Sequence, residues 1–262
     1  MKNPAKSQPT KIDEYAKTTF AAKASTGHLI THDVYQRGFG PPVILIQELP
    51  GIGKAMLRLA DKFVAEGFTV ILPHLFGPIG RVSIAGNFTR VFCMRKEFNL
   101  FTANKNSPIV DWLKALCQFT RESNDVAGVG VIGMCLTGNF ALSLMADDSV
   151  LAAVAAQPAM PIGKQAALDI APETIEKAKN RIDRLAPVKA YRFEGDPLVK
   201  AKKFKCIHDR FNDEGKTRVE MTVIPGPGHS VLTLDFVDEA EHPTRLALDE
   251  ILEYFHSQLD AS

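Results

Sequence analysis

Short apolar runs alternate along most of the chain with segments whose apolar positions recur at helical spacing. The run at 43–46, Val-Ile-Leu-Ile, has no polar position, which is typical of a strand buried on both faces of a sheet. Strands that alternate with helices predict a parallel sheet covered on both faces. In chain order the pattern predicts strands at 43–46, 68–72, 126–132, 151–156, 188–193 and 218–224, and helices at 54–66, 107–119, 139–145, 172–185, 198–211 and 243–259.

The N-terminal part of the chain departs from this alternation. Two β-rich stretches, 18–22 and 28–31, flank Ser-Thr-Gly and predict an antiparallel hairpin at an edge of the sheet. Residues 1–14 are polar and rich in Lys, so we expect a flexible tail there. No internal repeat or long linker interrupts the remainder, and 15–262 is therefore expected to form a single α/β domain with a mostly parallel central sheet.

Composition narrows the classes of partner. The chain has 31 Lys and Arg against 30 Asp and Glu, so its overall charge favours neither nucleic acid nor an anionic membrane, and a small molecule is the expected partner. Its four cysteines show no C-x-x-C spacing and suggest neither a disulfide framework nor a zinc site. We find no signal-peptide pattern and no apolar run of 18 residues. These features predict a soluble, cytoplasmic protein, and they leave its oligomeric state open.

A glycine-framed cysteine follows the strand at 126–132, in the sequence Gly-Met-Cys-Leu-Thr-Gly at 133–138. A strand that turns sharply into a helix needs small residues where the two backbones cross, and Gly133 and Gly138 meet that need. Cys135 then stands at the tip of the turn, beside the positive end of the new helix, which stabilises a thiolate. The pattern predicts a nucleophile elbow, and an inert core thiol is the alternative.

In a parallel sheet, the side chains that follow each strand gather at one edge. The strand at 188–193 is followed by Asp196 and the strand at 218–224 by His229, so the chain order is nucleophile, acid, histidine, as in α/β-hydrolases. His229 could take the thiol proton while Asp196 binds its other ring nitrogen, with Glu194 as the competing acid. The backbone N–H groups of Leu49 and Leu136 are the predicted oxyanion hole.

Three kinds of side chain could complete this site. Glu48 directly follows an apolar strand, where an unpaired carboxylate is costly to bury; it either takes part in proton transfer with Cys135 or lies in an exposed turn. His74, just past a strand end, is a candidate to line the site. The long segment 73–106 is mostly basic, and its Arg81 and Arg95 are candidates to bind a substrate carboxylate, with surface exposure as the alternative.

Taken together, these motifs resemble the dienelactone hydrolase family of α/β-hydrolases. The similarity rests on Ile-Gln-Glu-Leu-Pro-Gly at 46–51, the strand at 68–73, the motif around Cys135, Gly-Asp-Pro-Leu-Val at 195–199 and Pro-Gly-His-Ser at 227–230, and it covers about residues 28–258. It implies a Cys135–His229–Asp196 triad and a role for Glu48 in activating the cysteine when substrate binds. It also implies hydrolysis of an enol-lactone, such as a dienelactone from chloroaromatic breakdown, without cofactor or metal.

The chain departs from the family pattern at the elbow. The family usually has Gly two residues after the nucleophile, where this chain has Thr137, and a β-carbon there could displace the helix or shift the sulfur. The segment 73–106 also differs from the family, so the substrate is not carried over.

The sequence predicts a carboxylic ester hydrolase in which the Cys135 thiolate attacks an ester or lactone and His229 activates the water that releases the acid. A thioesterase or acyl transferase on the same scaffold, or a non-catalytic small-molecule binding protein, are the alternatives.

Overall fold

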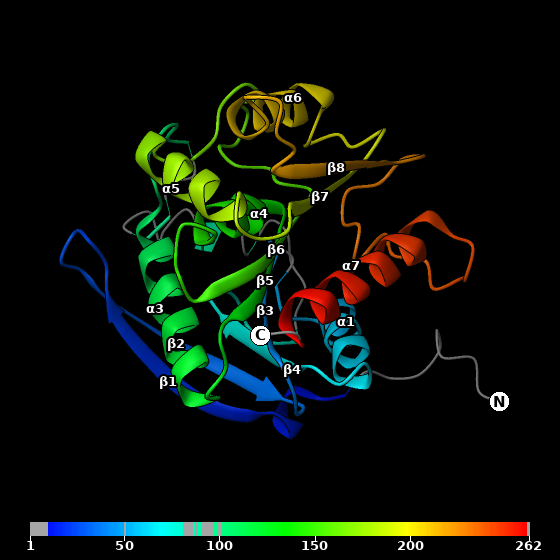
Figure 1. Cartoon of the computed structure of the whole chain (residues 1–262). Helices are drawn as coiled ribbons and strands as arrows, with labels where there is room; N and C mark the ends of the chain where they lie inside the picture. The colour runs from blue at the N-terminus through cyan, green and yellow to red at the C-terminus, as the bar shows by residue number, and fades with distance from the viewer. Residues whose placement is uncertain are drawn as a thin grey trace.

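The computed structural model describes residues 10–49, 51–80, 86, 89–90, 97–98 and 101–260. Within them a single sheet of eight strands runs through the molecule, in the order β1-β2-β4-β3-β5-β6-β7-β8 (Figure 1). The strands are β1 (Ala16–Lys23), β2 (Leu29–Arg37), β3 (Pro42–Ile46), β4 (Thr69–His74), β5 (Val129–Met134), β6 (Val150–Ala156), β7 (Val188–Phe193) and β8 (Val219–Ile224).

Strand direction divides the sheet into two parts. β1 pairs with β2 and β2 with β4 in antiparallel registers, whereas every pair from β4 through β3, β5, β6 and β7 to β8 is parallel. The predicted fold class and its antiparallel N-terminal edge are therefore confirmed. Both strands of the predicted hairpin are longer than predicted: β1 extends on each side of 18–22, and β2 continues beyond 31 to Arg37.

Helices cover both faces of the sheet. They are α1 (Lys54–Ala65), α3 (Pro108–Ser123), α4 (Gly138–Leu144), α5 (Pro172–Ile182), α6 (Ala201–Phe211) and α7 (Pro243–Leu259), with short 3-10 turns η2 (Ile12–Glu14) and η3 (Cys135–Thr137). Alternate residues of β3 point to opposite faces: Ile44 and Ile46 pack in the core beneath α3, α4, α5 and α6, and Val43 and Leu45 in the core beneath α1 and α7 (Figure 1). This two-sided burial explains the absence of polar positions in that run.

The N-terminal segment differs from the prediction where the structure describes it. The Thr10 N–H donates to Asp61 on α1 at 2.8 Å, and Ile12 packs against the core of that face. The part of the predicted tail from 10 to 14 is thus attached to the domain. Residues 1–9 lie outside the described residues. No helix in the described ranges is long and apolar enough to cross a membrane.

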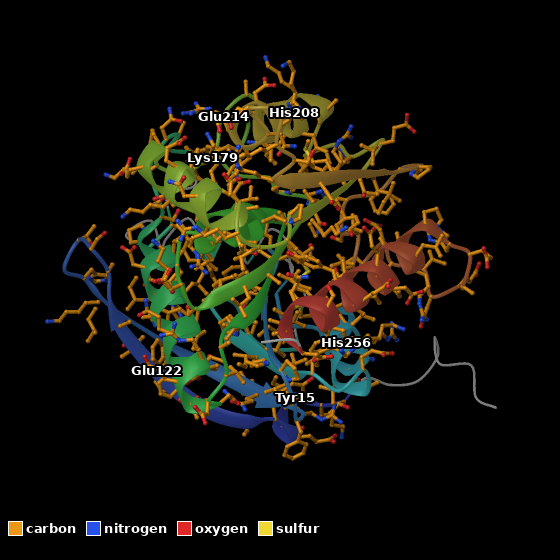
Figure 2. The ribbon with its side chains drawn as sticks, viewed as in Figure 1. Tyr15, Glu122, Lys179, His208, Glu214 and His256 are labelled. Carbon is orange, nitrogen blue, oxygen red and sulfur yellow. The ribbon has the colours of Figure 1, made fainter. Side chains whose placement is uncertain are left out.

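Ion pairs join the elements at the β8 edge. The buried guanidinium of Arg218 binds Asp183 and Asp213, and Lys179 also binds Asp213 at 2.6 Å. Figure 2 shows Lys179 and Glu214 at this end of the molecule, by α5 and α6. Because these contacts connect α5, α6 and β8, they support the two strands, β7 and β8, whose loops carry Asp196 and His229.

Candidate active site

Four of the predicted site residues follow strands that lie close together in the sheet. Glu48 comes after β3, Cys135 after β5, Asp196 after β7 and His229 after β8. The parallel pairing places all four strand ends at the same edge. Residues separated by up to 181 positions in the chain are brought to one edge in this way, and three of them, Glu48, Cys135 and Asp196, are buried.

The turn after β5 has the geometry of a nucleophile elbow. Cys135 has a φ of +54°, in the left-handed region that costs a non-glycine residue about 1–3 kcal/mol. A β-carbon on Gly133 would lie 2.1 Å from the Thr137 carbonyl oxygen, and one on Gly138 would lie 2.6 Å from the Cα of Pro158. Both glycines are therefore required by close backbone approaches, as the sequence predicted.

The Thr137 side chain lies on the β3 side of the elbow. Its hydroxyl accepts a hydrogen bond from the Met134 N–H at 2.9 Å. It can donate to the Met134 carbonyl oxygen at 2.9 Å, and the carbonyl oxygens of Ile46 and Gln47 lie at 3.3 Å. The crowded crossing falls at Gly138 instead. The Thr137 side chain is fully buried and hydrogen-bonded inside a turn that keeps Cys135 in the left-handed region, so the elbow accommodates its β-carbon.

Asp196 and His229 meet because the loops after β7 and β8 cross. The Gly195 N–H donates to the Gly226 carbonyl at 3.0 Å, and a β-carbon on Gly195 would approach that residue to 3.3 Å. His229 Nδ1 then lies 2.9 and 3.0 Å from the two carboxylate oxygens of Asp196. The competing acid, Glu194, is exposed.

The Asp196 carboxylate is held firmly. Its side chain is fully buried, and its Oδ1 also accepts the N–H groups of Leu198 and Val199, each at 2.8 Å. These backbone donors hold the carboxylate in the position from which it binds His229. They also satisfy a buried anion that would otherwise be costly.

The electrostatics of His229 connect it to the cysteine. Burial alone would lower the pKa of His229, but hydrogen bonding and electrostatic interaction with Asp196 and with the Cys135 sulfur raise it to about 10. Nε2 is buried and has no partner of standard hydrogen-bond geometry among the described residues, so its interaction with the sulfur is less well aligned than the Nδ1 contact. Such loose contacts are common in ligand-free active sites.

Glu48 is buried, and its carboxylate faces the loop that carries His229. It accepts hydrogen bonds from Ser230 Oγ at 2.9 Å, from Thr233 Oγ1 and, at 3.4 Å, from Gln157 Nε2. Burial raises the pKa of Glu48, although these bonds and the charge of His229 oppose the shift. The alternative prediction of an exposed turn is wrong, because Glu48 is buried. Its predicted participation in proton transfer with Cys135 stays a prediction, since the hydrogen bonds found among the described residues go to Ser230, Thr233 and Gln157.

Gln157 and Thr233 were not predicted as site residues. Gln157 is the first residue after β6, so the rule that selects strand ends would have found it; it has a φ of +36° and accepts the Val231 N–H at 3.4 Å. Thr233 lies in an irregular loop, four residues after His229, and no sequence pattern marks it.

The remaining predicted site residues are His74, the oxyanion-hole residues Leu49 and Leu136, and the two arginines of the basic segment. His74 Nε2 contacts the Gly77 carbonyl, and its ring packs at 6.4 Å from that of Tyr35. Leu136 is buried at the start of the elbow helix, and Leu49 packs against the adjacent core. The oxyanion-hole assignment of these two residues stays a prediction. Arg81 and Arg95 lie outside the described residues.

The fold and the order of these residues define an α/β-hydrolase architecture, and solved structures share it. A Klebsiella pneumoniae protein provisionally named a dienelactone hydrolase has a TM-score of 0.60 and 17% identity, over 92% of this chain and 98% of that one. The Pyrococcus furiosus esterase Pf2001 gives 0.58 and 15%, over 94% and 93%. A cold-adapted esterase from an Arctic intertidal metagenomic library gives 0.59 and 15%, over 96% and 97%.

Residues 29–259 match the family model of dienelactone hydrolases, and the chain belongs to the dienelactone hydrolase family. No curated protein matches the sequence significantly. Membership of this family supports a hydrolase that acts on esters.

Proposed function

We propose that the protein hydrolyses carboxylic esters or lactones through a Cys135 thioester intermediate. The observation that carries the proposal is the arrangement of three groups: Cys135 stands at the tip of a left-handed turn, and His229 binds the buried Asp196 through Nδ1, so that its buried Nε2 is left for the sulfur. The raised pKa of His229, about 10, has the Cys135 sulfur and Asp196 among its causes and agrees with this arrangement. A protonated imidazole beside the sulfur favours the thiolate, which is the nucleophilic form of cysteine. The left-handed turn at Cys135, where the family motif has its nucleophile, agrees with this assignment.

The proposed acylation step needs no separate base. The thiolate attacks the carbonyl carbon, and a C–S bond forms as the carbonyl oxygen takes the negative charge. The N–H groups of Leu49 and Leu136 are proposed to bind that oxygen. When the C–O bond breaks, the leaving alkoxide takes its proton from Nε2 of His229, and a thioester with a neutral histidine remains.

Deacylation follows from the loss of the sulfur's charge. Once Cys135 is acylated, one of the two negative charges that hold the proton on His229 has gone, so the pKa of His229 falls and the neutral ring can act as a base. It takes a proton from water, hydroxide attacks the thioester, and the C–S bond breaks to release the acid. The thiolate and the imidazolium are thereby restored.

We assign Asp196 to orienting His229 and stabilising its charge, and Glu48 to the loop that carries it. Glu48 binds Ser230 and Thr233 on either side of that loop's turn, and its raised pKa lets it exchange a proton at a higher pH than an ordinary carboxyl group. A role of Glu48 in proton transfer during activation is therefore part of the proposal.

The proposed substrates are esters with good leaving groups, above all enol-lactones, because a thiolate expels an enolate more readily than an amine. A carboxylate on the substrate, bound by Arg81 or Arg95, remains our prediction from the basic segment.

A turnover screen with matched cysteine variants tests this function. Enol-lactones, p-nitrophenyl esters and acyl thioesters are compared with and without an alcohol or amine acceptor. We expect hydrolysis of the first two classes to be lost in Cys135→Ala and kept in Cys206→Ala, which replaces another buried free cysteine. Preferred turnover of thioesters, or acyl transfer to the acceptor, would assign the alternative activities. A Cys135→Ala enzyme as active as the wild type would refute the mechanism.

A further inference from the structure

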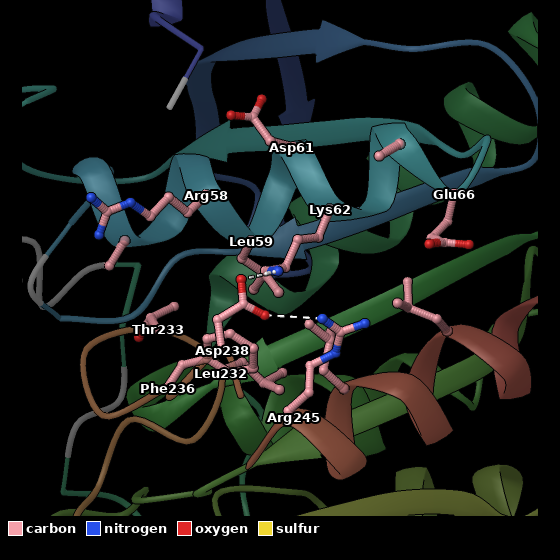
Figure 3. A pocket seen from close by; sticks show the side chains of 14 residues that line it. Arg58, Leu59, Asp61, Lys62, Glu66, Leu232, Thr233, Phe236, Asp238 and Arg245 are labelled. Carbon is pink, nitrogen blue, oxygen red and sulfur yellow. Dashed lines mark hydrogen bonds and ion pairs between the residues drawn. The ribbon is translucent and has the colours of Figure 1, made fainter. Parts of the chain in front are cut away.

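A cavity of about 470 Å³ lies between α1, α7 and the loop that follows His229. Figure 3 shows it from close by, with the ion pairs Lys62–Asp238 and Asp238–Arg245 across its middle. It is on the α1 and α7 face of the sheet, whereas the triad stands at the carboxyl edge of the strands. Its size falls within the range of about 300–1,000 Å³ that small-molecule sites occupy.

The lining of this cavity separates into an apolar floor and a charged row. The floor is formed by Leu59, Leu232, Phe236, Leu248 and Leu252. The row comes from one face of α1, where Arg58, Lys62 and Glu66 follow one another at intervals of four residues. A ligand that fits both surfaces has an apolar body and a charged end.

The charges at the Arg58 end of the cavity favour an anion, because Glu66, the other exposed charge of the row, lies two helical turns further along α1. Asp238 is the central carboxylate, and it is already bound by Lys62 at 2.7 Å and by Arg245 at 3.0 Å. Asp61, also in the lining, is bound by Arg37 at 2.8 Å. Arg58, by contrast, is exposed and has no hydrogen-bond or ion-pair partner among the described residues. An unpaired guanidinium beside an apolar floor matches a carboxylate, which it can bind through two hydrogen bonds.

We propose that this cavity binds a medium-chain monocarboxylate, with its carboxylate at Arg58 and its chain on the apolar floor. The cavity shares one residue with the catalytic cluster, because Thr233 both lines it and donates a hydrogen bond to Glu48. Leu232 and Phe236 of the floor belong to the same loop as His229. A bound acid would therefore hold this loop and change turnover. This second claim rests on the proposed function, whereas the claim that the cavity binds an acid does not.

Calorimetry on the full chain tests the binding. Decanoate is compared with 1-decanol and with decyltrimethylammonium, which have the same chain length but no charge or a positive charge. We expect decanoate to bind one to one and more tightly than either, and Arg58→Gln to weaken it about 10-fold, as one lost charged contact would. Arg184→Gln, which removes an exposed arginine elsewhere, is the matched control and should leave binding unchanged.

A cavity-filling variant provides the second arm. Ala55 lines the cavity on α1, and Ala55→Trp should reduce decanoate binding at least 10-fold while circular dichroism and the melting temperature verify that the protein is folded. Decanoate could instead occupy the catalytic site as a product analogue. Binding that survives both Ala55→Trp and Arg58→Gln but disappears after alkylation of Cys135 would show this and overturn the proposal.

The effect on turnover is measured separately. With p-nitrophenyl acetate at saturating concentration, decanoate should change kcat of the wild type at least twofold and leave kcat of Arg58→Gln nearly constant. An unchanged wild-type kcat, despite calorimetric binding that Arg58→Gln weakens, would refute the coupling through Thr233. Decanoate binding is also measured on Cys135→Ala. Because this measurement does not depend on turnover, it separates a failure of the binding proposal from a failure of the proposed function.

Discussion

Replacing Asp196 with Asn tests the link between the buried carboxylate and His229. The amide has nearly the shape of the carboxylate, so its oxygen can still accept the N–H groups of Leu198 and Val199, which hold the native side chain at 2.8 Å each. Its NH₂ group, however, would face the N–H of His229 at Nδ1, where the native oxygens lie at 2.9 and 3.0 Å. The substitution therefore removes the charge and disfavours the correct ring tautomer while it leaves the loop in place.

The magnitude follows from the pKa of His229. A rise from 6.5 to about 10 corresponds to about 5 kcal/mol in favour of the imidazolium. Asp196 and Cys135 both contribute to this stabilisation against the cost of burial. If each contributes about half, Asp196→Asn costs about 2–3 kcal/mol, which corresponds to a 30- to 150-fold lower kcat/KM. Less imidazolium also means less thiolate, so alkylation at pH 6–7 should slow by a similar factor.

The assay pairs two rates in each variant: kcat/KM for p-nitrophenyl acetate and the rate of alkylation by iodoacetamide, both between pH 5 and 9. Glu194→Gln is the matched control, because it removes a carboxylate two residues away that is exposed. We expect both rates to fall in Asp196→Asn and neither in Glu194→Gln. Equal rates in Asp196→Asn and the wild type, or equal losses in the two variants, would disprove the assignment of the acid.

Three further predictions concern the elbow and the core beside it. Thr137→Val should lower stability by about 1–3 kcal/mol in urea unfolding and reduce kcat, because the buried Met134 N–H loses its acceptor. Thr137→Ser keeps the hydroxyl and should leave both quantities near the wild-type values; equal effects of the two substitutions would contradict this. Gly138→Ala should cost about 1–3 kcal/mol, since its β-carbon would lie 2.6 Å from Pro158; an unchanged melting temperature would contradict it. Burial raises the pKa of Asp169 from 3.8 to about 6, so the native state binds its proton more tightly and stability is lost as pH rises through 6. Asp169→Asn removes this loss, so the free energy of unfolding of the variant relative to the wild type should be up to about 3 kcal/mol more favourable to the folded state at pH 7.5 than at pH 4. The same difference between variant and wild type at both pH values would refute the reasoning.

Local pattern alone predicted much of the fold and singled out the residues that meet in the proposed catalytic cluster. The uninterrupted apolar run of β3 revealed a strand covered on both faces, because no polar side chain can be tolerated on either side of it. Gly133 and Gly138 revealed the elbow, because a close backbone approach requires a residue without a side chain, and glycine can be recognised in the sequence. Cys135, Asp196 and His229 could be singled out because each follows a strand, and parallel strands end at one edge.

Tertiary structure decided how those groups are paired. Asp196 rather than Glu194 binds His229 because the crossing of two loops buries one carboxylate and leaves the other exposed, and no local pattern encodes a crossing. The Thr137 hydroxyl bonds to Met134 within the elbow, and only the folded sheet brings two further acceptors, the carbonyl oxygens of Ile46 and Gln47, to 3.3 Å from it. Glu48 binds Ser230 and Thr233 for the same reason: these contacts join residues more than 180 positions apart, and their geometry exists only once the sheet has formed.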